Sequence, residues 1–185
     1  GSLLKWLPGN TEDISSKTIT FAAGTVTFDT DANDVVLANS IGNGGTATFV
    51  KSGSGRLTLA ANAAFTGTAA ISGGVLQLGT GGATGSLPGA ITNNAELDVN
   101  IADGSSFGNV VSGTGSFVHS GTGALTLSSA NTFTGTTSIP EVTASLILAN
   151  SLALQGSTLQ YDTAGSPSPT SGGTIGFGSL TAATL

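Results

Sequence analysis

Large apolar residues alternate with polar residues in many short stretches of this chain, and clusters of Gly, Ser, Asn and Thr separate the stretches. A period of two places every second side chain on one face, which is typical of half-buried β-strands. The clusters between them are typical of turns. No stretch has the 3.6-residue apolar period and caps of a helix. The predicted strands are Thr18–Phe21, Thr25–Phe28, Thr48–Val50, Arg56–Leu59, Val75–Leu78, Glu96–Val99, Ser116–Val118, Ala124–Leu127, Ser145–Leu148 and Thr158–Tyr161.

One segment of the chain occurs twice. Residues 45–71 align without a gap with residues 113–139, and 15 of 27 positions are identical. Phe49 thus matches Phe117, and Lys51 matches His119. Such internal similarity indicates a repeat architecture.

Pairs of the form Leu-x-Leu recur about every 20 residues, which is the length of one coil of a β-solenoid. The pairs are Leu57/Leu59, Leu76/Leu78, Leu97/Val99, Leu125/Leu127 and Leu146/Leu148. Coils that stack at the spacing between strands, ~4.8 Å, would align these pairs in inward rows. We therefore predict an all-β, parallel β-solenoid of about eight coils, in which one copy of the repeat makes about three coils. Antiparallel β-sandwich modules are the alternative, because their strands alternate in the same way.

The repeats also divide the chain. The stretch 3–8 is larger and more apolar than anything later in the chain, so we expect residues 1–17 to be an N-terminal segment that is a candidate cap for the first coil. Residues 18–185 are then the solenoid, with repeat copies at 45–112 and 113–172 and a partial copy from residue 173.

Charge is scarce and unevenly placed. Charged residues make up 8% of the chain, the net charge is −6, and no basic residue follows Arg56. Nucleic-acid binding needs a basic patch, so it is not expected. No apolar run approaches the roughly 20 residues of a membrane helix, so no membrane insertion of this segment is expected. The chain has no Cys, so no disulfide can support the fold.

Two stretches resemble a known family, the autotransporter-associated β-strand repeat. The first runs from Lys51-Ser52-Gly53-Ser54-Gly55 through Leu57-Thr58-Leu59 to Phe65-Thr66-Gly67-Thr68, and the second from His119 to Phe133-Thr134-Gly135-Thr136. The first copy departs from the pattern at Ala63 and Ala64, and the second at Pro140 and Glu141. The resemblance implies a right-handed parallel β-helix in the passenger region of a bacterial surface or secreted protein, where the repeat is linked to secretion and to the presentation of binding regions.

Acidic residues cluster at one predicted turn. Asp29, Asp31 and Asn33 stand at positions 1, 3 and 5, as oxygen ligands do in a calcium loop. The loop pattern fails later, because Asp34 and Ser40 occupy the positions of its Gly and Glu. The residues are a calcium candidate, and an Asx-rich turn is the other interpretation. No other cofactor is expected.

Few other side chains point to chemistry, and we expect no catalytic residue and no enzyme. Trp6 and Tyr161 are the only Trp and Tyr and are candidates for stacking on a sugar ring, although Trp6 also fits the cap. His119 is the only His, and we expect it to point outward together with Lys51. Glu96 and Asp98 share one face of a strand, where a solvated row is expected rather than the opposed pair of a glycosidase.

These observations favour an extracellular or cell-surface β-solenoid that acts as a stiff shaft or adhesin within an autotransporter-like passenger region. The expected partner is a host or environmental surface, with polysaccharide as one candidate. A carbohydrate-binding module is an alternative function. A second alternative is a fibre subunit that associates end to end, because an uncapped solenoid exposes unpaired backbone groups.

Overall fold

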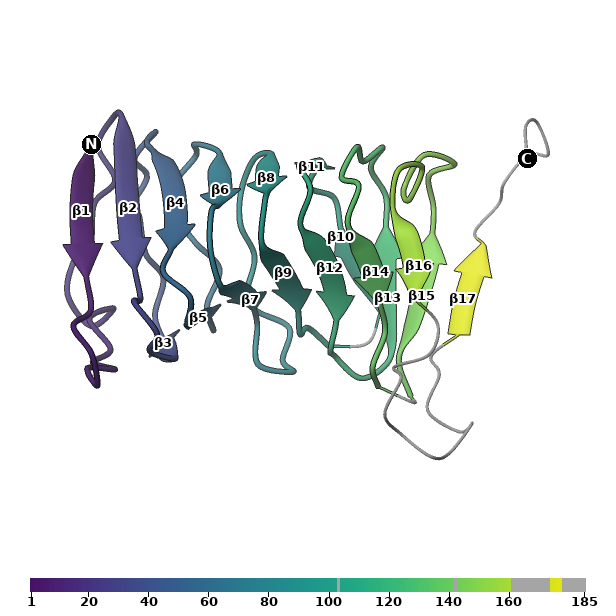
Figure 1. Ribbon diagram of the computed structural model, residues 1–185, viewed down its shortest axis with the longest axis horizontal. Coiled ribbons are helices and arrows are strands. Elements are labelled where there is room, and N and C mark those ends of the chain that lie inside the picture. Colours follow the sequence, from purple (N-terminus) through teal and green to yellow (C-terminus); the bar gives the residue numbers. More distant parts are fainter. Residues whose placement is uncertain (103, 142, 161–173, 178–185) are drawn as a thin grey trace.

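The protein is built from parallel strands that lie side by side along one axis. The computed structural model describes residues 1–102, 104–141 and 143–160 and the strand at 174–177. Figure 1 shows the coils following one another from β1 to β17. Every pairing between these strands is parallel. The predicted parallel β-solenoid is therefore confirmed, and the antiparallel sandwich is wrong.

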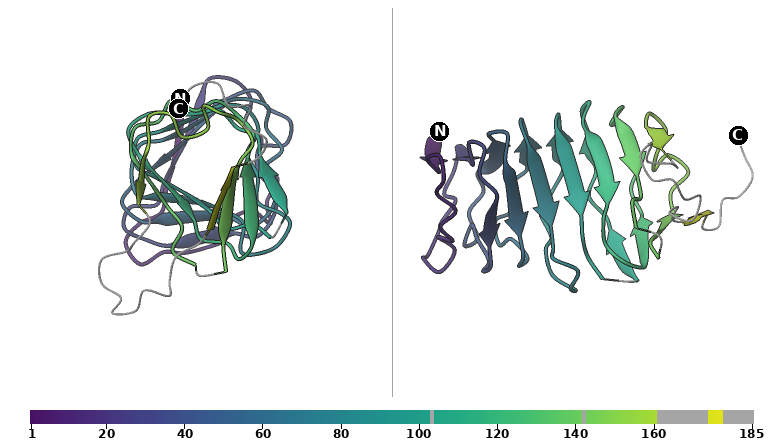
Figure 2. Two further views of the ribbon diagram at one scale, coloured as in Figure 1. Left: turned by 90° about the vertical axis from the view of Figure 1, so that its right-hand side faces the viewer. Right: turned by 60° about the horizontal axis from the view of Figure 1, so that its bottom comes forward.

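The strands form three sheets that enclose one interior, as the end-on view in Figure 2 shows. The first sheet contains β1 (Ser2–Lys5), β2 (Thr25–Asp29), β4 (Thr48–Ser52), β6 (Ala69–Ile71), β8 (Ile91–Asn93) and β11 (Val111–Ser112). The second contains β3 (Val35–Leu37), β5 (Arg56–Leu59), β7 (Val75–Leu78), β9 (Glu96–Val99), β12 (Ser116–His119), β14 (Thr136–Ser138) and β16 (Thr158–Gln160). The third contains β10 (Ser105–Phe107), β13 (Ala124–Leu127), β15 (Ser145–Leu148) and β17 (Thr174–Phe177).

The Leu-x-Leu pairs stack as their spacing predicts. Leu57 pairs with Leu76, and Leu76 with Leu97, in consecutive strands of the second sheet. All three side chains are fully buried. In the third sheet Leu125 pairs with Leu146. Parallel stacking in register places one Leu above another, so a spacing of one coil length becomes a continuous apolar row.

The solenoid has about seven turns rather than eight, since the longest sheet contains seven of the described strands. The difference follows from the length of the coils. The coil from Ser2 to its partner Val26 uses more of the chain than the coil from Leu57 to its partner Leu76. Longer turns near the N-terminus therefore leave room for fewer coils than the Leu spacing indicates.

The two sequence repeats lie on different faces of the solenoid. Strand β4, which begins the first copy, belongs to the first sheet, but its equivalent β12 belongs to the second sheet. Likewise β5 lies in the second sheet and its equivalent β13 in the third. Three coils along the first sheet take the chain from Phe49 only to Val111, whereas the repeat runs from Phe49 to Phe117. The repeat is therefore longer than three whole coils. The additional residues carry the chain on to the next face of the solenoid.

Aromatic rings fill the N-terminal half of the interior. The rings of Phe21, Phe28, Phe49 and Phe65 contact one another, with centroids 5.2 to 5.9 Å apart, and Trp6 meets Phe28 edge to face at 5.5 Å. All five side chains are buried. Such pairs add to the free energy gained from burial.

The N-terminal segment continues the same architecture. Strand β1 pairs in parallel with β2, and the indole N–H of Trp6 donates a hydrogen bond of 2.9 Å to the carbonyl of Glu12. The division of the chain at residue 17 and the role of this segment as a cap stay predictions. The end of the second repeat copy and most of the partial copy from residue 173 lie outside the described residues. Within the described residues, no helix is long and apolar enough to cross a membrane.

Candidate functional site

One face of the solenoid is irregular in its N-terminal half, and a surface groove opens there. The third sheet begins only at β10, so the stacked segments 15–21, 39–45 and 62–66 cover this face without forming strands. Backbone hydrogen bonds still join these segments, from Gly42 N–H to the Ile19 carbonyl and from Ala64 N–H to the Ile41 carbonyl. Irregular backbone leaves room between the segments that a flat sheet would close.

The first groove has a volume of about 520 Å³ and a mainly polar lining. Its lining residues are Ser15, Ser16, Lys17, Thr18, Ile19, Asn39, Ser40, Asn43 and Ala64. No carboxylate is among them. Part of this lining is held in place by its own hydrogen bonds, because Ser15 Oγ accepts from Asn39 N–H at 2.9 Å and Ser40 Oγ donates to the Asn62 carbonyl at 2.7 Å.

A second, smaller groove of about 270 Å³ continues along the same face. Its lining residues are Asn62, Ala83, Thr84, Gly85, Ser86, Ile101, Ser105 and Ser106. Asn62 and Ala64 belong to one segment, and each lines one of the two grooves. Thr84 Oγ1 donates to the Ala60 carbonyl at 2.7 Å, and Asn62 Oδ1 accepts from Gly85 N–H at 2.9 Å. Hydroxyl and amide groups on a partly fixed backbone are suited to hydrogen bonding with a polar ligand.

The three calcium candidates form a tight turn with protein partners. Asp29 Oδ1 accepts from Asp31 N–H at 2.8 Å, and this hydrogen bond, with Lys5 beside it, lowers the pKa of the Asp29 carboxyl. Lys5 Nζ lies 3.4 Å from Asp29 Oδ2 and 3.5 Å from Asp31 Oδ1. Asn33 Oδ1 accepts from Gly9 N–H, and its amide donates to the Leu7 and Thr30 carbonyls. These contacts belong to the Asx-rich turn, and calcium binding at this turn stays a prediction. The described part of the chain holds no cluster of three or more His, Asp or Glu side chains suited to a metal.

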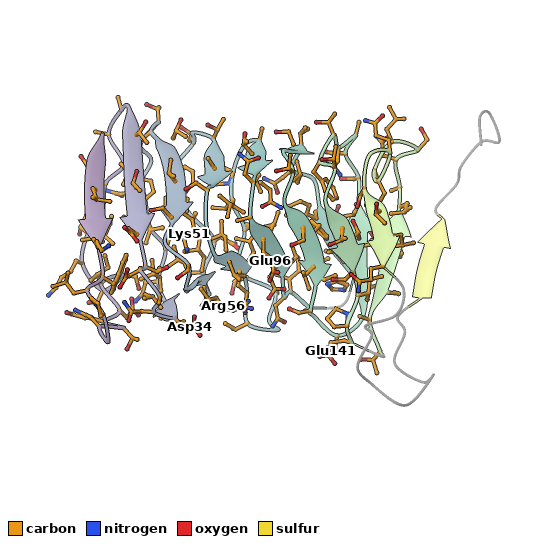
Figure 3. All side chains as sticks on the ribbon, in the orientation of Figure 1. Asp34, Lys51, Arg56, Glu96 and Glu141 are labelled. Carbon is orange, nitrogen blue, oxygen red and sulfur yellow. The ribbon has the colours of Figure 1, made fainter. Side chains whose placement is uncertain are left out.

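Lys51 points into the solenoid, and the expectation that it points outward is wrong. Its side chain is fully buried, and Nζ donates to three carbonyls, of Ser52 at 2.8 Å and of Gly53 and Gly73 at 3.0 Å. Figure 3 shows Lys51 between the coils, near the turn that follows β4. Burial lowers the pKa of Lys51 to about 8, although Asp29 and Asp34 act in the other direction.

His119 is buried as well, so the same expectation is wrong for the second repeat. Its ring nitrogens lie 3.0 Å from the Val99 carbonyl and 3.1 Å from the Gly123 carbonyl. The alternation itself carries the signal for both residues. Lys51 follows the buried Phe49 by two positions, and His119 follows the buried Phe117 by two, so a period of two places all four inward.

Asp98 is part of a buried polar network rather than of a solvated row, which corrects the expectation for that strand. Its side chain is 6% exposed, and Arg56 lies 2.6 Å from its Oδ2. The same guanidinium nitrogen donates to Gln77 Oε1 at 2.7 Å, and Ser120 donates to Asp98 Oδ1 at 2.5 Å. This network joins four consecutive coils. Glu96, labelled with Arg56 in Figure 3, is only half-buried.

Trp6, one of the two aromatic candidates, offers no platform for a sugar ring. Trp6 is 3% exposed and packs on Phe28, so its ring faces are inside the fold. Tyr161 lies outside the described residues. Sequence reasoning missed the two grooves. The predicted strand Thr18–Phe21, which contributes to the first groove, forms only an isolated bridge between Thr20 and Gly42, and the segments that line the grooves carry no recognisable motif.

Comparisons with known proteins agree with this architecture. The passenger-associated-transport-repeat family matches residues 49–78 and 117–139, which lie in the two copies of the internal repeat. The chain is 39% identical over 88 residues to the adhesin BmaC autotransporter of Brucella suis biovar 1 (strain 1330), a match that covers 46% of this chain. The matched region spans only 3% of that protein's length. No solved structure matches the chain.

The matched repeats coincide with the coils that carry the Leu rows and the Phe-Thr-Gly turns. Passenger repeats of autotransporters belong to the bacterial cell surface or the extracellular space, and the fold is the one that the resemblance implies. This chain is a β-solenoid that carries two matches to the passenger-associated-transport-repeat, and these similarities indicate a location at the bacterial cell surface or outside the cell.

Proposed function

We propose that this chain is a non-enzymatic, adhesin-like passenger segment that serves as a stiff shaft and presents its lateral faces to a host or environmental surface. The observation that carries the proposal is the stacking in register of the passenger repeats. Each coil hydrogen-bonds to the next along two or three sheets, and the interior is closed by rows of Leu, Val and Phe. A rod of this kind resists bending, because any bend must break backbone hydrogen bonds or separate packed side chains.

The adhesive part of the proposal rests on two observations. The relative found by comparison is named an adhesin, and the repeats of this chain belong to passenger regions. The chain also carries few charges, so long-range repulsion from an anionic cell surface is modest for a net charge of −6. A stiff rod keeps its lateral face extended, so this face can contact a target surface along its length.

A bead assay tests adhesion directly. The purified chain is coupled to beads, which are then applied to epithelial cell layers, to extracellular matrix and to abiotic surfaces under flow. Beads that carry the same chain after thermal unfolding, and beads that carry a non-adhesive acidic protein, are the controls. Retention above both controls on at least one surface supports the proposal, and equal retention on every surface refutes it.

The shaft is tested separately by solution scattering. A rod with one axial coil per strand spacing gives a pair-distance distribution with an early maximum and a long linear tail, and a compact globule gives a symmetric one. End-to-end association stays a prediction, which light scattering across a range of protein concentrations examines in the same samples.

A further inference from the structure

The two grooves on the irregular face have the chemistry of a binding site. Their linings are rich in Ser, Thr and Asn, and neither contains a carboxylate. Three adjacent side chains of the first groove, Ser16, Lys17 and Thr18, are exposed and form no hydrogen bond with the described residues. Two hydroxyls and one ammonium group are therefore available to a ligand at the same edge of the groove.

Lys17 differs from the three other basic residues of the chain, all of which lie in the described part. Lys5 pairs with Asp29 and Asp31, and Arg56 pairs with Asp98. Lys51 is buried with its ammonium on three carbonyls. Among the described residues Lys17 has no acidic partner, and it stands in a groove without carboxylates. A single cation among neutral donors and acceptors matches a ligand with one carboxylate among many hydroxyls.

The overall charge restricts the ligand further. A net charge of −6 repels a densely charged polyanion such as nucleic acid or a heavily sulfated chain. A sparsely charged ligand is compatible, because one ion pair offsets the repulsion and the hydroxyl and amide groups supply the other contacts. Ile19 and Ala64 add a small apolar contact to the groove lining.

The arrangement along the solenoid sets the length of the site. Lining residues come from five stacked segments, around residues 17, 41, 63, 85 and 105, so the two grooves together extend over roughly 20 Å along the axis at ~4.8 Å per coil. A ligand that occupies both grooves is extended and several sugar rings long.

We propose that the irregular face binds an acidic oligosaccharide, with a sugar carboxylate on Lys17 and the sugar hydroxyls on the Ser, Thr and Asn side chains of the two grooves. The proposal rests on the adhesin-like function proposed above and names the surface component recognised. Sialic acid and uronic acids share this chemistry.

The test measures binding in solution by calorimetry at low and physiological salt. The probes are galacturonic acid, sialyllactose and sialyl-lacto-N-tetraose, which carries one carboxylate on five sugar rings, with lactose as the neutral control and a glutamate tetramer as the peptide control. At least one acidic sugar is expected to bind, more weakly at higher salt, with lactose weaker than sialyllactose. Sialyl-lacto-N-tetraose is expected to bind more tightly than sialyllactose, because its additional neutral rings reach the second groove. Equal affinities confine the site to the first groove and overturn the extended one.

Three variants assign the contact. Lys17→Gln is expected to weaken acidic-sugar binding about tenfold, as loss of a charge-assisted hydrogen bond does. Lys17→Arg, which keeps the charge, and Lys5→Gln, which removes an equal charge elsewhere, are expected to stay within about twofold of the parent. Unchanged binding in Lys17→Gln, an equal loss in Lys5→Gln, or a glutamate tetramer that binds as well as the sugars overturns the proposal.

Failure here differs from failure of the proposed function. If beads carrying the chain adhere but no acidic sugar binds, the groove proposal is wrong and the adhesin-like function stands. If beads carrying Lys17→Gln lose retention on surfaces that display acidic sugars, both proposals are supported together.

Discussion

Lys51 and His119 occupy the same position in the two sequence repeats, and both point inward, but they do so from different sheets and satisfy different carbonyls. Lys51 ends on carbonyls of its own turn and of the next coil, at Gly73. His119 lies between the preceding coil, at Val99, and its own turn, at Gly123. A polar head at this position therefore satisfies backbone groups that the Ser-Gly turn leaves inside the fold.

Replacing Lys51 with Ala is expected to lower the free energy of unfolding by about 2 kcal/mol or more. The change opens a cavity where the aliphatic stem was packed and removes the donor for three carbonyls. Chemical denaturation followed by circular dichroism measures the effect. Lys17→Ala, which removes the same side chain from the surface, is the matched control and is expected to change stability by less than about 0.5 kcal/mol. Equal effects in the two variants would contradict the buried role.

Stability is expected to rise with pH above pH 8 because of Lys51. Its pKa is about 8 in the folded chain against 10.5 as the ordinary value. Between these values the unfolded chain binds the proton more than the folded chain does, so the free energy of unfolding increases with pH, by up to about 1 kcal/mol per unit.

Comparison with Lys51→Met over pH 7 to 10.5 isolates this contribution, because Met has a similar stem and does not titrate. The difference between parent and variant is expected to change in favour of the parent as pH rises. A constant difference across the range would show that Lys51 titrates normally.

Gly67, in the Phe-Thr-Gly-Thr stretch of the first repeat, is expected not to tolerate a side chain. A Cβ at this residue would lie 2.0 Å from the carbonyl oxygen of Ala47, in the coil before it. Two coils would have to separate, so Gly67→Ala is expected to cost about 1–3 kcal/mol, as overpacking does. Gly82→Ala is the control, since a Cβ there meets no atom within 4 Å. Thermal unfolding of the two variants side by side checks the contrast, and similar melting temperatures would refute it.

Loss of Arg56 is expected to destabilise the chain more than loss of an exposed cation. Arg56→Met leaves the carboxylate of Asp98 buried without its ion-pair partner, at an expected cost of about 3 kcal/mol. Lys5→Met breaks ion pairs with the more exposed Asp29 and Asp31 and is expected to cost less than about 1 kcal/mol. A double variant that adds Asp98→Asn to Arg56→Met should recover part of the loss. Urea denaturation of the parent, the two single variants and the double variant measures this. Additive effects in this cycle would count against a coupled pair.

Trp6 is expected to be a core residue of the first coils. Trp6→Ala removes its packing on Phe28 and its hydrogen bond to Glu12, so a loss of about 3–5 kcal/mol is expected. Leu7→Ala is the control, because Leu7 is next in sequence but 65% exposed, and it should change the free energy of unfolding little. Urea titrations of both variants, followed by circular dichroism, measure the difference, and a tolerant Trp6 would indicate that these residues fold apart from the rest.

Sequence could predict the Leu-bearing strands and their stacking, because an inward Leu above an inward Leu repeats at the length of a coil. Leu57, Leu76 and Leu97 show this directly, since their spacing alone gives their pairing. The face on which each repeat copy lies could not be predicted, because it depends on turn lengths, which vary from coil to coil. Lys51 shows a different limit: its charge favours the surface, but the alternation that it shares with Phe49 places it inside.

The grooves lay beyond prediction because they arise from an absence of regular structure. Residues 15–17 and 39–43 have no period that marks them as a surface, and only the stacking of the coils brings Lys17 beside Asn39 and Asn43. A site composed of ordinary Ser, Thr and Asn residues has no motif to recognise. Its one chemical signal is Lys17, a basic side chain without an acidic partner among the described residues. This signal becomes visible only when the partners of the three other Lys and Arg side chains are known.

The step of one face between the repeat copies has a consequence for longer arrays of the same unit. Each further copy of the repeat places the motif about a third of a turn further around the solenoid axis. About three copies therefore bring it back to its starting face. Successive motifs then follow a helical path around the solenoid axis. A filament built from such repeats presents the motif on every side, so it can bind a flat surface in any rotation about its long axis.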